Sequence, residues 1–162
     1  MNDAWLPEVL SEEDCDTQSR YAHFRRDYIE SPPSNFAPKA FRVDDTIRED
    51  GKEEAFFHLT TTGGENRKHD PYRCGRIEWG KPVIERTDSR DIVTWRVRQK
   101  GENRIKMALQ DFTYLVVVAE DNEAVRLVTA FYVHAQSQRV KIEKEAKEAG
   151  GESAVAPVST SP

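Results

Sequence analysis

Four apolar runs separated by short polar turns occupy the second half of the chain, and they restrict the fold more than any other feature. In the first run, Val93, Trp95 and Val97 alternate with other side chains, which is the two-residue period of a strand. Because the links are short, consecutive strands should pair antiparallel. We expect the first hairpin to have one polar, basic face. The expected strands are residues 91–98, 104–109, 112–119 and 125–134.

A helix is expected before these strands. Ser11 and Asp14 have the spacing of a capping box, and apolar side chains follow at helical spacing as far as Ile29. Two prolines within residues 31–34 end this helix, because proline cannot continue it.

A second helix is expected after the strands. Residues 136–148 form a charged segment with Val140 and Ile142 as its apolar contacts. One helix, a run of antiparallel strands and a final helix predict an α+β fold with a four-stranded antiparallel sheet.

The segment between the first helix and the strands is harder to interpret. Residues 55–61 are aromatic and β-branched, which predicts a strand. Residues 63–71 contain glycines and polar and basic side chains, and so predict a loop. Residues 72–79 are compatible with a short helix or a turn, and Val83 and Ile84 with a short strand.

The length of 162 residues suits one domain. We expect an irregular N-terminus over residues 1–10, a domain over residues 11–148 and a disordered tail over residues 149–162. The longest apolar run is too short to cross a bilayer, and the first residues lack the pattern of a secretory signal. Cys15 and Cys74 have no zinc-like spacing. These features predict a cytoplasmic protein without a membrane partner, a metal site or a cofactor.

Charge is unevenly distributed along the chain. The formal net charge of −5 argues against a nucleic-acid partner if it is treated as evenly spread. Residues 66–110, however, carry 12 Lys and Arg against 6 Asp and Glu, whereas residues 1–65 carry 7 against 15. Attraction for phosphate depends on the local field, so the basic middle segment favours a phosphate-binding surface. The alternative is a solvated strand surface that happens to be basic.

Two histidines are candidates for function. His58 can act as a general acid or base, because the imidazole pKa lies near neutrality; it can equally be a structural histidine with a satisfied hydrogen bond. His69 lies beside Arg67 and Lys68 in the basic loop. These three side chains can contact RNA phosphates or bases, or can simply be exposed.

Arginine and threonine side chains complete the candidate site. Arg73 and Arg76 are three residues apart, which can put them on one side of a helical turn, and guanidinium groups bind phosphate oxygens in pairs. The alternative is an ion pair with a nearby glutamate. Thr129 can donate a hydrogen bond to phosphate, and Arg96 and Lys106 on the basic hairpin can assist in RNA binding. Thr129 and Tyr132 should face opposite sides of a regular strand.

Several segments carry a resemblance to a known group, and they extend from about residue 20 to residue 146. They are residues 50–53, 56–60, 67–70, 73–79, 84–85, 114–118 and 127–132. In their order and spacing they resemble a phage-associated branch of the barnase–EndoU–colicin–RelE-like (BECR-fold) nucleases. This resemblance implies an N-terminal helix followed by a four-stranded antiparallel sheet, and RNA cleavage that needs no metal.

The resemblance also implies roles for individual residues. His58 would act as acid or base, Arg73 and Arg76 would hold the phosphate, and Thr129 would orient it. The expected function is that of an endoribonuclease, a hydrolase-type toxin of a toxin–antitoxin pair or a phage-derived effector, with RNA and an antitoxin or inhibitor protein as partners. The alternatives are a non-catalytic binding module for nucleic acid or protein, and a phage accessory protein that binds through its acidic N-terminal segment.

Overall fold

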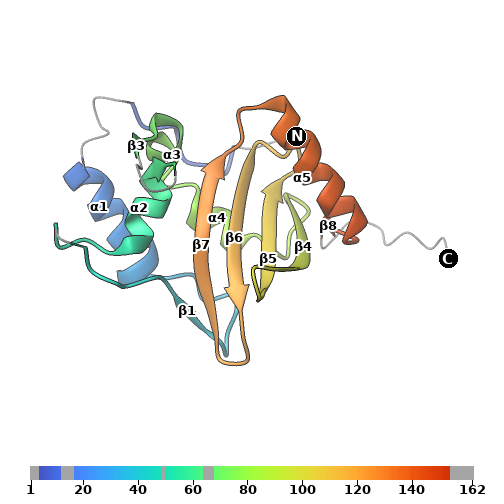
Figure 1. Ribbon diagram of the computed structural model, residues 1–162, viewed down its shortest axis with the longest axis horizontal. Coiled ribbons are helices and arrows are strands. Elements are labelled where there is room, and N and C mark those ends of the chain that lie inside the picture. The colour runs from blue at the N-terminus through green and yellow to red at the C-terminus, as the bar shows by residue number, and fades with distance from the viewer. Residues whose placement is uncertain (1–3, 12–16, 49, 64–67, 154–162) are drawn as a thin grey trace.

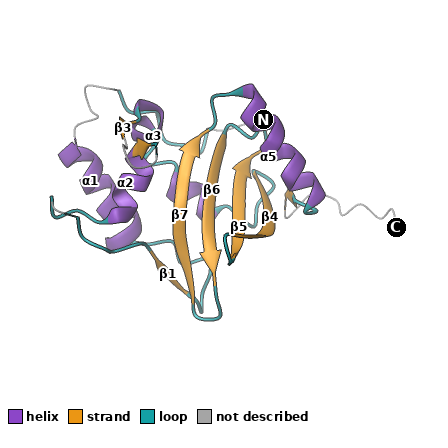
Figure 2. Cartoon of the chain, in the orientation of Figure 1, coloured by secondary structure: helices purple, strands orange, loops and turns teal. Residues whose placement is uncertain are grey.

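A mixed β-sheet forms the centre of the protein in the computed structural model, which describes residues 4–11, 17–48, 50–63 and 68–153 (Figures 1 and 2). Within these residues the sheet has six strands in the order β1-β7-β6-β5-β4-β8. The strands are β1 (Ala40–Arg42), β4 (Ile92–Gln99), β5 (Glu102–Leu109), β6 (Tyr114–Glu120), β7 (Ala124–Tyr132) and β8 (Glu152–Ser153).

The four expected strands form the middle of this sheet. Consecutive strands from β4 to β7 pair antiparallel, and Lys100 and Gly101 close the first hairpin with φ angles of 52° and 76°. The α+β class is therefore confirmed. The sheet is larger than expected because β1 adds parallel to β7 and β8 pairs antiparallel with β4.

β8 lies at the beginning of the segment expected to be a disordered tail. Ser153 pairs with Val93 and Glu152 pairs with Thr94, so this part of residues 149–162 is ordered against the sheet. The rest of the expected tail, residues 154–162, lies outside the described residues.

Five α-helices and a small two-stranded sheet surround the main sheet within the described ranges. They are α1 (Thr17–Arg25), α2 (Glu54–Thr60), α3 (Pro71–Gly75), α4 (Gly80–Glu85) and α5 (Gln136–Glu148), with β2 (Thr61–Thr62) paired to β3 (Lys68–His69). The π-helical turn η1 (Arg26–Glu30) continues α1 and ends immediately before the two prolines, as expected. Asp14 of the expected capping box lies outside the described residues.

The prediction of a strand over residues 55–61 was wrong for all but its last residue, because residues 55–60 lie in α2 and Thr61 begins β2. Ala55, Phe56, Leu59 and Thr60 are buried, and this spacing is the period of a helix rather than a strand. The hydroxyl of Thr60 donates to the carbonyl of Phe56 at 3.0 Å, in the bond from residue i to i−4 that Ser and Thr make in helices. Tertiary burial therefore outweighs the β-propensity of the segment.

The short strand expected at Val83 and Ile84 was also wrong. Both residues lie in α4 and are fully buried in the main core. Pro82 is the third residue of that helix, in its first turn, where the missing N–H of proline has no intrahelical acceptor to lose.

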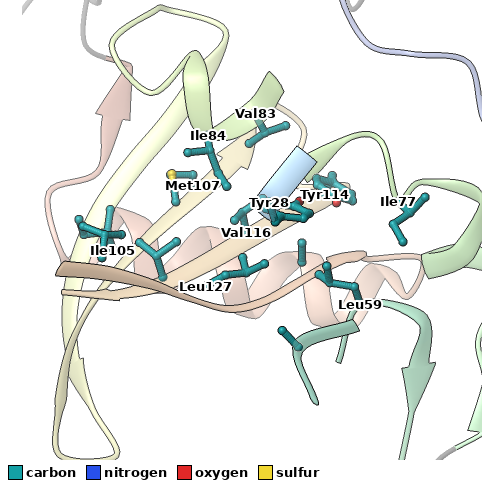
Figure 3. Close-up of a cluster of buried hydrophobic side chains, with 14 of the residues drawn as sticks. Tyr28, Leu59, Ile77, Val83, Ile84, Ile105, Met107, Tyr114, Val116 and Leu127 are labelled. Carbon is teal, nitrogen blue, oxygen red and sulfur yellow. The ribbon is translucent and has the colours of Figure 1, made fainter. Parts of the chain in front are cut away.

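Two hydrophobic clusters cover the two faces of the sheet. The larger one packs α1, α2 and α4 against residues such as Met107, Val116 and Leu127 (Figure 3). The smaller one contains Trp95 and Val117 and lies under α5, which Figure 1 shows crossing the sheet beside β4 and β5. Since helices cover both faces, near-continuous apolar runs such as Tyr114–Ala119 are accounted for.

Burial on both faces corrects the expectation of a polar, basic hairpin face. Lys106 is only 8% exposed, and its Nζ lies 2.7 Å from Oε1 of Glu145 in α5. The helix α5 has the expected bounds, and Ile142 packs on the smaller cluster as expected. Val140, by contrast, is 55% exposed, and Ala146 is the buried residue of that helix.

No helix within the described ranges is long and apolar enough to cross a membrane.

Two buried tyrosines constrain the main core beside α4. Burial raises the pKa of Tyr28 and of Tyr114, so both hydroxyls stay protonated. Figure 3 shows the two side chains together. The hydroxyl of Tyr28 has no hydrogen-bond partner among the described residues. A Cβ at Gly80 would lie 2.0 Å from this hydroxyl and 3.3 Å from the ring carbon that carries it. Glycine at position 80 therefore leaves space for Tyr28.

Gly80→Ala should lower the free energy of unfolding by about 2 kcal/mol, because the added methyl overlaps the Tyr28 hydroxyl. Tyr28→Phe should be neutral or raise it by up to about 1 kcal/mol, since it removes a buried hydroxyl without a partner. In the double variant the phenylalanine should recover much of the loss. Urea unfolding of the four proteins measures the coupling; additive effects would show that the contact does not exist.

Candidate functional site

The helix α3 begins at a well-defined capping signal. Oδ1 of Asp70 accepts hydrogen bonds from the backbone N–H groups of Tyr72 at 2.9 Å and Arg73 at 3.3 Å, and Pro71 is the first helical residue. Asp70 and Pro71 therefore set where this five-residue helix starts. Arg73 in this helix and Arg76, the residue directly after it, both contact side chains of β7, which packs against α2 and α3 (Figure 1).

Arg73 joins three elements. Its Nη1 donates to the backbone carbonyl of His58 in α2 at 2.5 Å and to Oγ1 of Thr129 in β7 at 3.2 Å. Its Nε lies 3.6 Å from Oδ2 of Asp70, and its guanidinium carbon lies 4.9 Å from the ring centre of Phe131. Three of the four expected catalytic residues are therefore connected through one guanidinium group.

Arg76 packs against two aromatic rings near the end of β7. Its guanidinium carbon lies 3.8 Å from the ring centre of Tyr132 and 5.1 Å from that of Trp79. Burial lowers the pKa of Arg76 from its usual value, and nearby tyrosines oppose this effect. The Nε of Arg76 is buried without a hydrogen-bond partner among the described residues, although Nη1 donates to the carbonyl of Tyr72.

Thr129 and Tyr132 face opposite sides of the sheet. Thr129 pairs with Val117, which belongs to the cluster under α5, whereas Tyr132 pairs with Tyr114 of the main core. The irregularity in the pairing falls between Val117 and Val118, so it does not bring the two side chains to one face. The charges of Arg73 and Arg76 nevertheless both oppose the rise in the pKa of Tyr114, so both arginines lie near this hydroxyl.

The imidazole of His58 and its backbone carbonyl contact different residues. Its Nε2 lies 3.8 Å from Oε1 of Glu54, one helical turn earlier, and its side chain is 39% exposed. Glu54 and His58 make an accessible carboxylate–imidazole pair, which is a suitable arrangement for moving a proton.

Three aromatic side chains that the sequence analysis left out of the site gather around Arg76. The ring of Tyr72 stacks on His134 with centres 4.7 Å apart and on Tyr132 with centres 5.8 Å apart. Arg139 of α5 donates from Nη2 to the Tyr132 hydroxyl at 3.4 Å. We call Tyr72, Tyr132 and His134 the aromatic cluster. No sequence signal joins these residues, because α3 and the end of β7 meet only in the fold.

The basic loop contributes two described residues. Lys68 and His69 form β3 and are exposed, and Nδ1 of His69 lies 3.4 Å from Sγ of Cys74. The side chain of Cys74 is buried. Arg67 lies outside the described residues.

The other two expected RNA-binding residues lie away from this group. Arg96 is in β4, three strands from β7, and its Nε lies 3.0 Å from Glu120. Lys106 is buried in its pair with Glu145 and is not available at the surface. A cavity of about 470 Å³ is lined by Arg42, Arg98 and Arg126, but it lies at the opposite end of β7 and is also lined by acidic side chains.

The arrangement around the end of β7 therefore holds two guanidinium groups, a hydroxyl and an accessible imidazole. Such a set can bind a phosphate group and transfer protons near it. No cluster of three or more His, Cys, Asp or Glu side chains within the described ranges could hold a metal ion. Comparison with family models, curated proteins and solved structures finds no match for this chain.

The buried pair under α5 gives a test of stability against pH. Burial alone would raise the pKa of Glu145, but hydrogen bonds from Lys106 and the Trp95 indole outweigh this effect and lower the pKa below 4.5. The pair therefore stabilises the fold above pH 4.5, and this contribution is lost as the pH falls through the lower folded-state pKa.

Glu145→Gln should lose less stability than the wild type on acidification below pH 4.5, because the glutamine has no proton to gain. Glu143→Gln removes an exposed carboxylate of the same helix and serves as the matched control. Thermal unfolding across this pH range measures the difference. Identical pH dependence in all three proteins would mean that the buried pair does not contribute as described.

Proposed function

We propose that this protein is a metal-independent endoribonuclease whose site lies at the end of β7. The observation that carries the proposal is the contact of Arg73 with both the His58 backbone and the Thr129 hydroxyl. These residues come from three elements and are separated by 15 and 56 positions from Arg73.

The proposed reaction is attack of a ribose 2′-hydroxyl on the adjacent phosphorus. The bond between the 2′-oxygen and phosphorus forms as the bond to the 5′-oxygen breaks, giving a cyclic phosphate and a 5′-hydroxyl. One proton leaves the 2′-hydroxyl and one is delivered to the departing 5′-oxygen. The imidazole of His58, exposed beside Glu54, is suited to one of these transfers.

The arginines supply positive charge for the phosphate. The guanidinium of Arg76 stays charged at any working pH and has an Nε without a protein acceptor among the described residues. Arg73 holds Thr129 and places a second positive charge beside it. Charge that develops on the phosphate in the transition state would be stabilised by these groups without their having to move.

The proposed activity also implies a protein partner. A cytoplasmic ribonuclease would need control, so an antitoxin or inhibitor protein is the expected second partner. The segment over residues 1–65, with its excess of acidic side chains, is unlike a simple basic ribonuclease. Its charge is suited to docking a basic partner protein.

RNA should be cleaved by the purified protein in the presence of EDTA. His58→Ala and Arg76→Ala should each lower the cleavage rate at least about tenfold, because one removes a proton-transfer group and the other a phosphate-binding charge. Lys144→Ala, which removes an exposed cation from α5, should leave the rate unchanged. Gel analysis of tRNA, mRNA and ribosomal RNA fragments measures this. Intact RNA in all three substrates would exclude the proposed activity.

A second function is favoured by one specific contact. Nη1 of Arg73 donates to the backbone carbonyl of His58, so this guanidinium secures the backbone near the end of α2. This geometry also suits a non-catalytic binding module for nucleic acid. That alternative predicts binding that weakens with salt and no turnover of the bound strand.

A further inference from the structure

The aromatic cluster is positioned at the surface beside the proposed catalytic residues. Tyr72 is 47% exposed and His134 is exposed, while Tyr132 is half-buried. The interplanar angles of Tyr72 are 20° with Tyr132 and 18° with His134, so the three rings are nearly parallel. Aromatic rings in this arrangement offer a flat apolar surface that water covers poorly.

Positive charge surrounds this surface. Arg76 lies over the Tyr132 ring, and Arg139 contacts its hydroxyl. Among the described residues, neither arginine lies within 4.0 Å of a carboxylate oxygen, in contrast to Arg96 and Lys106. Arg139 is held in place by a hydrogen bond from its Nε to the carbonyl of Val133. The cluster thus combines exposed rings with two arginines whose charge is not neutralised by an ion pair.

We propose that the aromatic cluster is a stacking surface for unpaired nucleobases, and that the protein selects single-stranded over double-stranded nucleic acid. Exposed aromatic side chains next to arginines stack on bases, and this requires bases that are not already paired and stacked in a duplex. Arg76 belongs to both the cluster and the proposed catalytic group. A base held on Tyr72 therefore brings its phosphate backbone close to Arg76.

This inference deepens the proposed function, because it names the substrate class of the same site. Stacking alone does not distinguish RNA from DNA, since both have bases with flat aromatic faces. Binding can therefore be measured without cleavage on two strands that lack a free 2′-hydroxyl, single-stranded DNA and 2′-O-methyl RNA. Duplex RNA of the same sequence provides the comparison for strandedness.

The experiment is fluorescence anisotropy of these three labelled oligonucleotides with the full chain in EDTA. Both single strands should bind more tightly than the duplex. Tyr72→Leu and His134→Leu should each weaken binding of both single strands roughly tenfold, as expected for the loss of one stacking ring. Tyr72→Phe keeps the ring and should bind like the wild type, and so should Lys144→Ala. Thermal unfolding of each variant checks that the fold is retained.

Three results would overturn the inference. They are equal binding by Tyr72→Leu and Tyr72→Phe, duplex RNA bound as tightly as the single strands, and no binding of any oligonucleotide, which would assign the surface to a protein partner. A failure of the stacking surface can be distinguished from a failure of the proposed nuclease function. Ring-dependent binding without RNA cleavage would support the stacking surface and exclude the nuclease. RNA cleavage that Tyr72→Leu leaves unchanged would support the nuclease and exclude the stacking surface.

Discussion

The short pairing of β1 with β7 is the constraint on which the candidate site depends. β1 covers only Ala124 to Arg126 of β7, so the rest of that strand has no strand neighbour on its outer side within the described residues. Exposed strand edges are usually covered by other elements. Here α2 and α3 pack at this edge, and Arg73 reaches β7 from α3 while also binding the end of α2. Because β1 leaves this part of β7 without a strand neighbour, α2 and α3 can pack there and bring residues distant in sequence into contact.

The distribution of charge is a second determinant of where a polyanion can bind. The basic segment from residue 66 to residue 110 suggested a broad phosphate-binding surface. In the fold, however, Lys106 is neutralised by Glu145, and Arg86 lies 3.0 Å from Asp91. Arg104 lies 3.0 Å from Glu102. Much of the excess positive charge is thus paired locally, and Arg73 and Arg76 are the basic residues of this segment that contact β7.

The sequence pattern predicted those elements in which a regular alternation of apolar and polar residues, or a charged helical pattern, extends over many residues. The strands from residue 91 onward and α5 were found because their alternation or charge pattern extends over many residues. The segment 55–61 was assigned to a strand because its phenylalanines and threonines favour strands as residue types, whereas the spacing of its buried side chains is helical. β1 and β8 are too short to leave a pattern, since their pairing depends on distant parts of the chain.

The candidate site was predictable only in part, for the same reason. His58, Arg73, Arg76 and Thr129 were chosen for their chemistry, and the fold brings all four to α2, α3 and β7. The contacts that these side chains make could not be predicted from the sequence, because a contact such as that of Arg73 with a backbone carbonyl depends on tertiary packing. Tyr72 and His134 were missed because two isolated aromatic residues carry no signal until α3 is placed beside the end of β7.

We propose that the groups around Arg73 and Arg76 cleave RNA through its own 2′-hydroxyl. Mass spectrometry can identify the ends produced when the protein acts in EDTA on an RNA and on the same strand with 2′-O-methyl groups. Fragments that end in a cyclic phosphate are expected from the RNA, and no fragments are expected from the methylated strand. Fragments from the methylated strand, or RNA fragments that carry a 5′-phosphate, would contradict this proposal.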